Sequence, residues 1–168
     1  MNVKHGYGKE IVVQTKLILP RLRRHLLPRP ALADRLGEAR HYRLTIVHAS
    51  TGYGKSTALV SALQRPSQPL YWYSITEGDR DPLLFLLYLI YAFRLHHPDL
   101  GDLPLQLVQE TGTAPRRYQM IIDALVNDLV SLGNGERLLV LDDYHLVNVA
   151  PLITFVLCAV RKYHIPKE

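Results

Sequence analysis

The sequence is poor in cysteine and has no apolar run long enough to cross a bilayer. Its one cysteine, Cys158, excludes an internal disulfide and lies in an apolar helical stretch, which favours an inert core thiol over a catalytic one. The longest apolar run, residues 83–93, is well short of the ~20 residues that a spanning helix needs. Residues 1–10 are polar and glycine-rich, unlike a secretory signal. We therefore expect a cytoplasmic protein with no membrane partner.

Positive charge is concentrated near the N-terminus. Residues 1–43 carry ten Lys/Arg against three Asp/Glu, a balance of +7, and the remainder carries ten against twelve, a balance of −2, which gives the net charge of +5. The basic cluster comprises Arg21, Arg23, Arg24 and Arg29. Such a cluster could contact nucleic acid or a phosphate, but it has no aromatic neighbours for stacking, which favours a solvated surface.

The 168 residues suffice for one domain with a core. We expect a flexible arm over residues 1–15 and a partial nucleotide-binding domain over residues 16–168, with residues 16–30 extended on its surface. Strands are predicted at 43–49, 70–75 and 137–141, a loop at 96–104, and helices at 31–38, 55–63, 82–95, 115–132 and 151–162. Strands that alternate with helices predict an α/β fold, a parallel sheet with flanking helices.

A glycine-rich segment lies between the first predicted strand and the next predicted helix. It reads Ala49-Ser50-Thr51-Gly52-Tyr53-Gly54-Lys55-Ser56-Thr57 and has the Gly-Lys-Ser of the Walker A pattern, with Ala at the usual first Gly. The glycines permit a curled backbone whose N–H groups face phosphates. Lys55 can reach the β- and γ-phosphates, and the Ser56 hydroxyl can ligate Mg²⁺. The alternative is an ordinary turn, but the context favours a purine nucleoside triphosphate site, in which Tyr53 either packs against the ribose or faces solvent.

Four aliphatic residues, 138–141, lead into the paired acids Asp142 and Asp143. A buried strand of this kind delivers a carboxylate to its C-terminal edge, as in the Walker B layout. Asp142 is predicted to hold Mg²⁺, usually through a water, and Asp143 to act as a general base on the attacking water. Such an acid alone is more often a helix cap, and the phosphate loop favours the catalytic interpretation. His145 is interpreted as a structural loop residue rather than a proton carrier.

Further motifs occur in a fixed order along the chain. They are Thr15-Lys16-Leu17, Pro20-Arg21-Leu22, Leu27-Pro28-Arg29-Pro30, Trp72-Tyr73-Ser74, Glu77-Gly78-Asp79-Arg80-Asp81-Pro82 and Val140-Leu141-Asp142-Asp143-Tyr144-His145. Together with the phosphate loop, this set resembles the N-terminal ATPase domain, of the STAND type, of MalT-like, LuxR-family transcriptional regulators. The resemblance runs from about residue 15 to residue 162.

The resemblance implies a P-loop NTPase fold of the additional-strand class and a switch function. Such regulators hold ADP at rest, and ATP with an inducer opens them into oligomers whose C-terminal helix-turn-helix binds promoter DNA. It implies slow hydrolysis of ATP to ADP and phosphate, and an adenine contact from Arg29. Ser50 and Thr51 replace the Pro-Ala common in the family, and both still present backbone amides to phosphate.

One expected strand has no counterpart in the sequence. In this class of fold, the strand after Walker B inserts between the phosphate-loop strand and the Walker B strand and brings a γ-phosphate sensor. The winged-helix, inducer-binding and DNA-binding domains are also without counterparts before Glu168. We therefore expect an N-terminal fragment, truncated after the Walker B strand and the following helix, with a gap in its sheet. A P-loop kinase, a non-catalytic nucleotide-binding or interaction module, and a degenerate product remain as alternatives.

Overall fold

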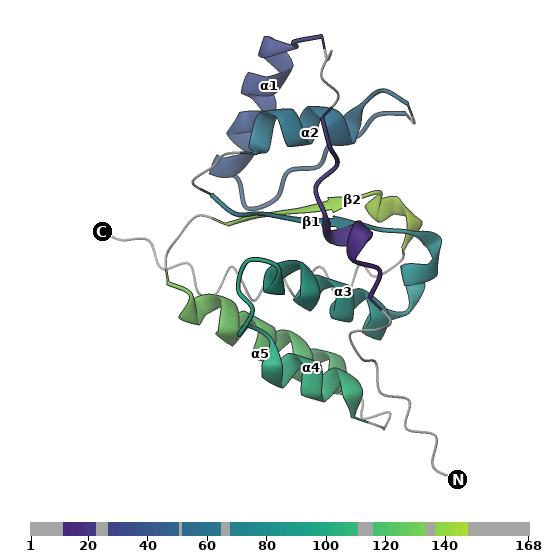
Figure 1. Ribbon diagram of the computed structural model, residues 1–168, viewed down its shortest axis with the longest axis vertical. Helices are drawn as coiled ribbons and strands as arrows, with labels where there is room; N and C mark the ends of the chain where they lie inside the picture. The colour runs from purple at the N-terminus through teal and green to yellow at the C-terminus, as the bar shows by residue number, and fades with distance from the viewer. Residues whose placement is uncertain are drawn as a thin grey trace.

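The computed structural model describes residues 12–22, 27–50, 52–64, 68–110, 116–133 and 137–147. Two parallel strands, β1 (Leu70–Ser74) and β2 (Leu138–Asp142), pair at the centre, with the first residues of both strands opposite each other. Helices α1 (Pro30–Gly37) and α2 (Lys55–Leu63) lie on one side of the pair, and α3 (Pro82–Arg94), α4 (Asp102–Gln109) and α5 (Arg117–Ser131) lie on the other (Figure 1). The predicted α/β class with parallel strands and flanking helices is confirmed for these elements.

The larger core lies between the strands and the layer of α3, α4 and α5. Helix α3 begins where predicted, because Pro82 occupies its first position and the Asp81 carboxylate accepts a hydrogen bond from the Leu83 amide at 2.8 Å. Alternation along β1 directs Tyr71 and Tyr73 into this core. The largest fully buried side chains of this core are Tyr71, Tyr73, Phe85, Leu86, Leu87, Leu89, Ile90, Ile121, Ile122 and Leu125.

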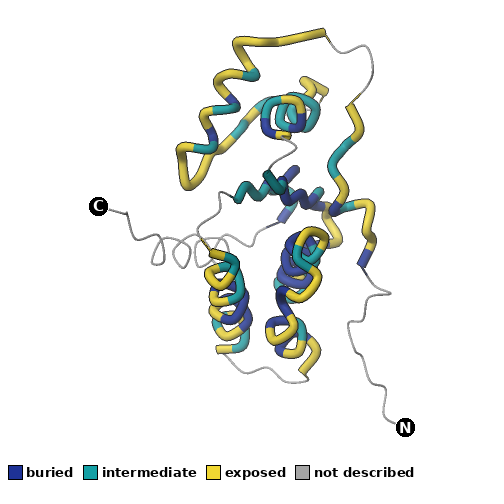
Figure 2. The backbone as a smooth tube through the Cα atoms, turned by 60° about the vertical axis from the view of Figure 1, so that its left-hand side comes forward, coloured by how far each residue is buried: buried dark blue, intermediate teal, exposed yellow. Residues whose placement is uncertain are grey.

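The smaller core lies on the opposite face of the strands. Trp72 of β1 and Val140 of β2 pack there with Val60 and Leu63 of α2. Helix α1 contributes little to it, since Leu36 is its one buried residue and most of its length is exposed (Figure 2). The face that carries the phosphate-loop helix is therefore much less buried than the face that carries α3 and α5.

A short N-terminal segment crosses the edge of the sheet and contacts both cores. Its 3₁₀-helix η2 (Gln14–Leu17) packs beside β1; Leu17 is buried in the larger core, and Leu19 packs against the smaller one. Val12 is also buried, so the packed part of the chain begins ahead of residue 16. The extended surface course predicted for residues 16–30 therefore holds only beyond Leu17, in the described part of that stretch.

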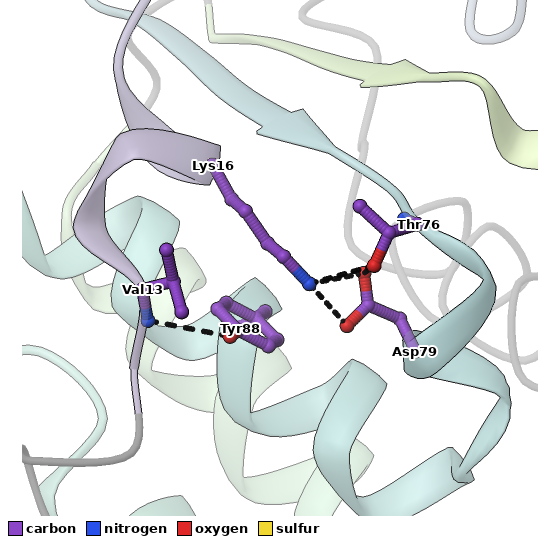
Figure 3. A network of polar contacts seen from close by, with 5 residues as sticks. All are labelled: Val13, Lys16, Thr76, Asp79 and Tyr88. Atoms are coloured by element: carbon purple, nitrogen blue, oxygen red, sulfur yellow. Dashed lines mark hydrogen bonds and ion pairs between the residues drawn. The ribbon is translucent and has the colours of Figure 1, made fainter.

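An ion pair between a half-buried lysine and a fully buried aspartate fixes this segment to the chain that follows β1 (Figure 3). Lys16 Nζ lies 2.7 and 2.9 Å from the two carboxylate oxygens of Asp79, which is fully buried in the 3₁₀-helix η4 (Glu77–Arg80). The same ammonium donates to Thr76 Oγ1 at 2.8 Å and lies 4.6 Å from the centre of the Tyr88 ring. Thr76 and Asp79 also form a reciprocal capping box at the start of η4. Each polar group of the pair is thus hydrogen-bonded, as burial of a charge requires.

The strand predicted at residues 43–49 is wrong. These residues form no strand, and the side chains of Leu44 and Ile46 are 56% and 82% exposed. The physical reason is pairing, because β2 pairs with β1, and among the described residues no strand lies beside residues 43–49 to share backbone hydrogen bonds with them.

A helix was also missed in the loop predicted at residues 96–104. Helix α4 starts at Asp102, directly after Gly101, whose φ of +86° belongs to the left-handed region. Pro104 sits in the first turn, where a missing amide costs no helical hydrogen bond. The other predicted elements in the described part agree with the structure to within a few residues, including the stop of α5 before Gly133 at a φ of +79°.

Some predictions lie outside the described residues. They concern residues 1–11, Arg23, Arg24, Thr51, Cys158 and the helix at 151–162. Within the part of the chain that is described, no helix is long and apolar enough to span a bilayer.

Candidate functional site

The phosphate loop has a backbone that its glycines make possible. Gly52 and Gly54 have φ values of +85° and +75°, in the left-handed region that side chains disfavour. Gly54 is the N-cap of α2, and no side chain caps this helix end. The first amides of α2 therefore point out of the helix without intrahelical partners, an arrangement that suits an anion.

Lys55, the first residue of α2, folds back onto the loop. Its ammonium donates to the carbonyl oxygen of Ala49 at 2.8 Å and lies 3.5 Å from that of Ser50. Hydrogen bonds from an ammonium to an anionic oxygen are stronger than those to neutral carbonyls. A phosphate at the mouth of the loop can thus compete for this ammonium.

Ser56 and Asp142 join the two halves of the site. The Ser56 hydroxyl donates to Asp142 Oδ2 at 2.6 Å, although the two residues are 86 positions apart in the sequence. Ser56 lies in the first turn of α2, and Asp142 ends β2 with only 9% of its surface exposed. The structure therefore brings together the two side chains that the sequence nominates as magnesium ligands.

Asp143 has an unusual backbone for its residue type. Its φ of +57° is the one left-handed value at a non-glycine position in the described residues, and aspartate tolerates this conformation better than most residues. It occupies the N-cap position of the 3₁₀-helix η5 (Tyr144–Leu146) without a side-chain capping bond, and its carboxylate lies 3.9 Å from Nδ1 of His145. Burial raises the pKa of the neighbouring Tyr144 above its ordinary value of 10.

A hollow of about 370 Å³ lies between the phosphate loop, the first turn of α2 and the chain that follows β2. Its volume is in the range of small-ligand sites. The residues that line it are Gly52, Gly54, Lys55, Ser56, Thr57, Asp143, His145 and Leu146. One permanent cation and one carboxylate therefore face the same space, above the first turn of a helix.

The oxygen ligands fit magnesium that arrives with a nucleotide. No group of three or more His, Cys, Asp or Glu residues in the described part of the chain could hold a metal by itself. Mg²⁺ prefers oxygen ligands and is commonly held by one or two protein groups together with substrate phosphates and water. The Ser56 hydroxyl and the Asp142 carboxylate match that donor set.

Several predicted binding residues do not line this hollow. Ala49, Ser50 and Asp142 lie behind it and reach it through Lys55 and Ser56, to which they are hydrogen-bonded. Arg29 is exposed at the N-cap of α1, where it makes no side-chain capping bond, and it does not line the hollow. Tyr53 is 71% exposed, which is the solvent-facing alternative left open by the sequence. Thr51 lies outside the described residues. Conversely, no feature of the sequence singles out Leu146, which lines the hollow only because of the turn after Asp143.

Comparison with known proteins finds similarity to part of a set of bacterial regulators. It is 31% identical over 140 residues to the HTH-type transcriptional regulator MalT of Klebsiella pneumoniae, 32% over 139 residues to that of Cronobacter sakazakii, and 30% over 140 residues to that of Yersinia enterocolitica. Each match covers 82% of this chain, and the chain spans about 15% of the length of these curated relatives. No family model and no solved structure matches the sequence. The chain is therefore homologous to one region of MalT regulators.

Proposed function

We propose that this homologue of the MalT regulators binds ATP or ADP with Mg²⁺ at its phosphate loop, as the nucleotide switch of a transcription regulator. The observation that carries the proposal is the 2.6 Å contact between Ser56 and Asp142. It joins a helix N-terminus that suits phosphate to the end of a strand that presents a carboxylate. Neither half alone would distinguish a nucleotide site from an ordinary turn or a helix cap.

Each residue has a role that follows from its position. The loop amides and the first turn of α2 bind phosphate oxygens, and Lys55 exchanges its bonds to the loop carbonyls for bonds to the β- and γ-phosphates. Ser56 and Asp142 hold the magnesium ion, which neutralises phosphate charge when it is bound. Asp143 faces the same hollow and orients the attacking water as a general base. Hydrolysis would be slow, because catalysis in this chemistry depends on positioning and charge stabilisation, and the sequence offers no candidate γ-phosphate sensor.

Regulation beyond nucleotide binding belongs to the rest of such proteins. The relatives carry the description of HTH-type transcriptional regulators, and this chain corresponds to about 15% of their length. DNA binding and self-association are therefore proposed for full-length relatives, with this region supplying the nucleotide-dependent change of state.

Titration of the purified chain with fluorescent ADP and a non-hydrolysable ATP analogue, with and without Mg²⁺, tests the proposal. Asp142→Asn and Ser56→Ala should weaken binding about tenfold or more with Mg²⁺ and much less in EDTA, because each removes a metal ligand. Lys55→Ala should weaken binding in both conditions. Absence of binding to the parent chain below millimolar nucleotide would contradict the proposal.

Matched controls separate loss of a ligand from loss of structure. Asp123→Asn and Ser131→Ala make the same chemical changes on exposed positions of α5 and should leave both affinities unchanged. Product analysis with ATP and candidate acceptors separates a switch ATPase, which releases ADP and phosphate, from a kinase. Binding with no release of phosphate over hours would favour the non-catalytic module.

A further inference from the structure

A second hollow adjoins the phosphate-loop hollow along η5. It has a volume of about 350 Å³ and is lined by Arg80, His145, Leu146 and Val147. His145 and Leu146 also line the first hollow, so the two spaces share a wall. Arg80 thus brings a guanidinium, from the chain that follows β1, to the neighbourhood of the phosphate loop.

The position of Arg80 is fixed from two sides. It is the last residue of η4, which the capping box of Thr76 and Asp79 and the ion pair with Lys16 hold in place (Figure 3). On the other side, its Nε donates to the carbonyl oxygen of Leu146 at 3.3 Å. Because the Asp79 carboxylate pairs with Lys16 on the buried side, it does not form an ion pair with the exposed Arg80.

The guanidinium of Arg80 keeps most of its hydrogen-bonding capacity. Arginine carries five N–H donors in a planar fork, and the bond from Nε is the single one that Arg80 makes to the described residues. Of the acids beside it in sequence, Asp81 caps α3 through the Leu83 amide, and Glu77 is exposed at the start of η4. The free N–H groups are therefore available to an anion.

The phosphate-loop hollow by itself is short of positive charge. Lys55 is the one permanent cation among its described lining residues, and Asp143 faces it with a negative charge. A triphosphate adds a terminal phosphate to what a diphosphate presents, and in this hollow Lys55 is shared between the β- and γ-phosphates, which leaves room for a second cation at the γ-phosphate. The planar fork of an arginine matches phosphate oxygens in a bidentate manner.

We infer that Arg80 binds the terminal phosphate of a nucleoside triphosphate and so allows this site to distinguish a triphosphate from a diphosphate. The inference rests on the proposed function. It supplies a γ-phosphate contact from the chain after β1, where the sequence offered no candidate. Arg80 contacts the ligand once its bond to the Leu146 carbonyl is exchanged for bonds to phosphate, just as Lys55 exchanges its own carbonyl partners.

The test compares the affinity for a non-hydrolysable ATP analogue with the affinity for ADP, both with Mg²⁺. Arg80→Gln should weaken triphosphate binding about tenfold and leave ADP binding within about twofold, since it removes a charge-assisted bond to the last phosphate alone. Arg80→Lys keeps the charge without the fork and should fall between the parent and Arg80→Gln. Arg116→Gln, at an exposed arginine that precedes α5, is the control and should change neither affinity.

The outcomes separate this inference from the proposal beneath it. If the parent binds both nucleotides and Arg80→Gln weakens both equally or neither, the inference is wrong and the proposed function stands. If the parent binds neither nucleotide, the proposed function fails and the inference fails with it. A thermal unfolding curve for each variant shows whether it is folded. If Arg80→Gln is unstable, the ratio of triphosphate to diphosphate affinity is measured for Arg80→Lys instead, and a smaller shift in the same direction is expected.

Discussion

The two faces of the β1–β2 pair differ in what holds them together. On the face of α3, α4 and α5, aromatic and aliphatic side chains form a continuous buried core, whereas the face of α1 and α2 has a small cluster around Trp72 and an exposed segment at residues 43–49. The chemistry predicted for this chain lies at the phosphate loop, on the less buried face. Stability and the candidate site are thus largely carried by different halves of the molecule, and substitutions should separate them.

The largest effect is expected where the N-terminal segment ties the two faces together. Lys16→Met should lower the free energy of unfolding by about 3–5 kcal/mol, because it leaves the fully buried Asp79 carboxylate without its cation. Arg94→Met breaks an ion pair whose acid, Asp102, is 71% exposed, and should cost no more than about 1 kcal/mol. Urea unfolding measures both, and equal costs would show that burial does not decide the strength of these pairs.

The same isoleucine-to-alanine change should lower stability strongly on one face and hardly at all on the other. Ile121→Ala empties a fully buried position in the larger core and should cost about 2–5 kcal/mol. Ile46→Ala trims a side chain that is 82% exposed and should change stability by about 0.5 kcal/mol or less. Thermal or urea unfolding of the pair tests the contrast. A large loss for Ile46→Ala would mean that residues 43–49 are packed in solution.

Two glycines with similar backbone angles provide a finer comparison. Gly101→Ala should cost about 1–3 kcal/mol or more, because φ is +86° and the new Cβ would lie 2.5 Å from Cγ2 of Ile90. Gly54→Ala has a φ of +75° but no atom within 4 Å of its new Cβ, so backbone strain of about 1 kcal/mol should be its whole cost. Unfolding curves measure the difference, and equal costs would contradict the contact with Ile90.

The smallest expected effect is a dependence on pH confined to the well-packed face. Burial lowers the pKa of His97 below its ordinary value of 6.5, with Arg137 and His96 adding to the shift. The unfolded chain therefore binds a proton more readily, so stability should fall as the pH drops through 6.5 toward the folded pKa. His97→Gln should flatten this part of the pH–stability curve. His48→Gln, at an exposed position of the other face, should leave it unchanged.

Local signals predicted most of the described helices. Asp81 and Pro82 start α3, Pro30 starts α1, and Gly133 follows the end of α5, because caps, prolines and left-handed glycines act within a few residues. Helix α4 escaped notice, because Gly101, Asp102 and Pro104 read as a loop when taken alone. Helix α4 forms because its apolar residues pack against α5, a contact between segments distant in the sequence that a local pattern does not reveal.

Residues 43–49 show the limit of composition as a guide to strands. Their apolar, β-branched sequence favours a buried strand, but a strand also needs a neighbour to accept and donate its backbone hydrogen bonds. The contact between Ser56 and Asp142 was predictable, since both the phosphate-loop motif and the acidic strand end nominate a ligand for the same magnesium ion. The adjacency of Arg80 was not, because it depends on how η4 and η5 turn after their strands.

The separation of Ser56 and Asp142 along the chain has a consequence for how the site is made. The phosphate loop leaves the ribosome 86 residues before its acidic partner, a delay of roughly 4–17 s at typical rates of synthesis of about 5–20 residues per second. Pairing of β2 with β1 is equally non-local, and parallel strands are slow to form. A nascent chain can thus offer its loop to phosphate for seconds before Asp142 is present, so its affinity for magnesium nucleotide should rise late in synthesis and in a single step.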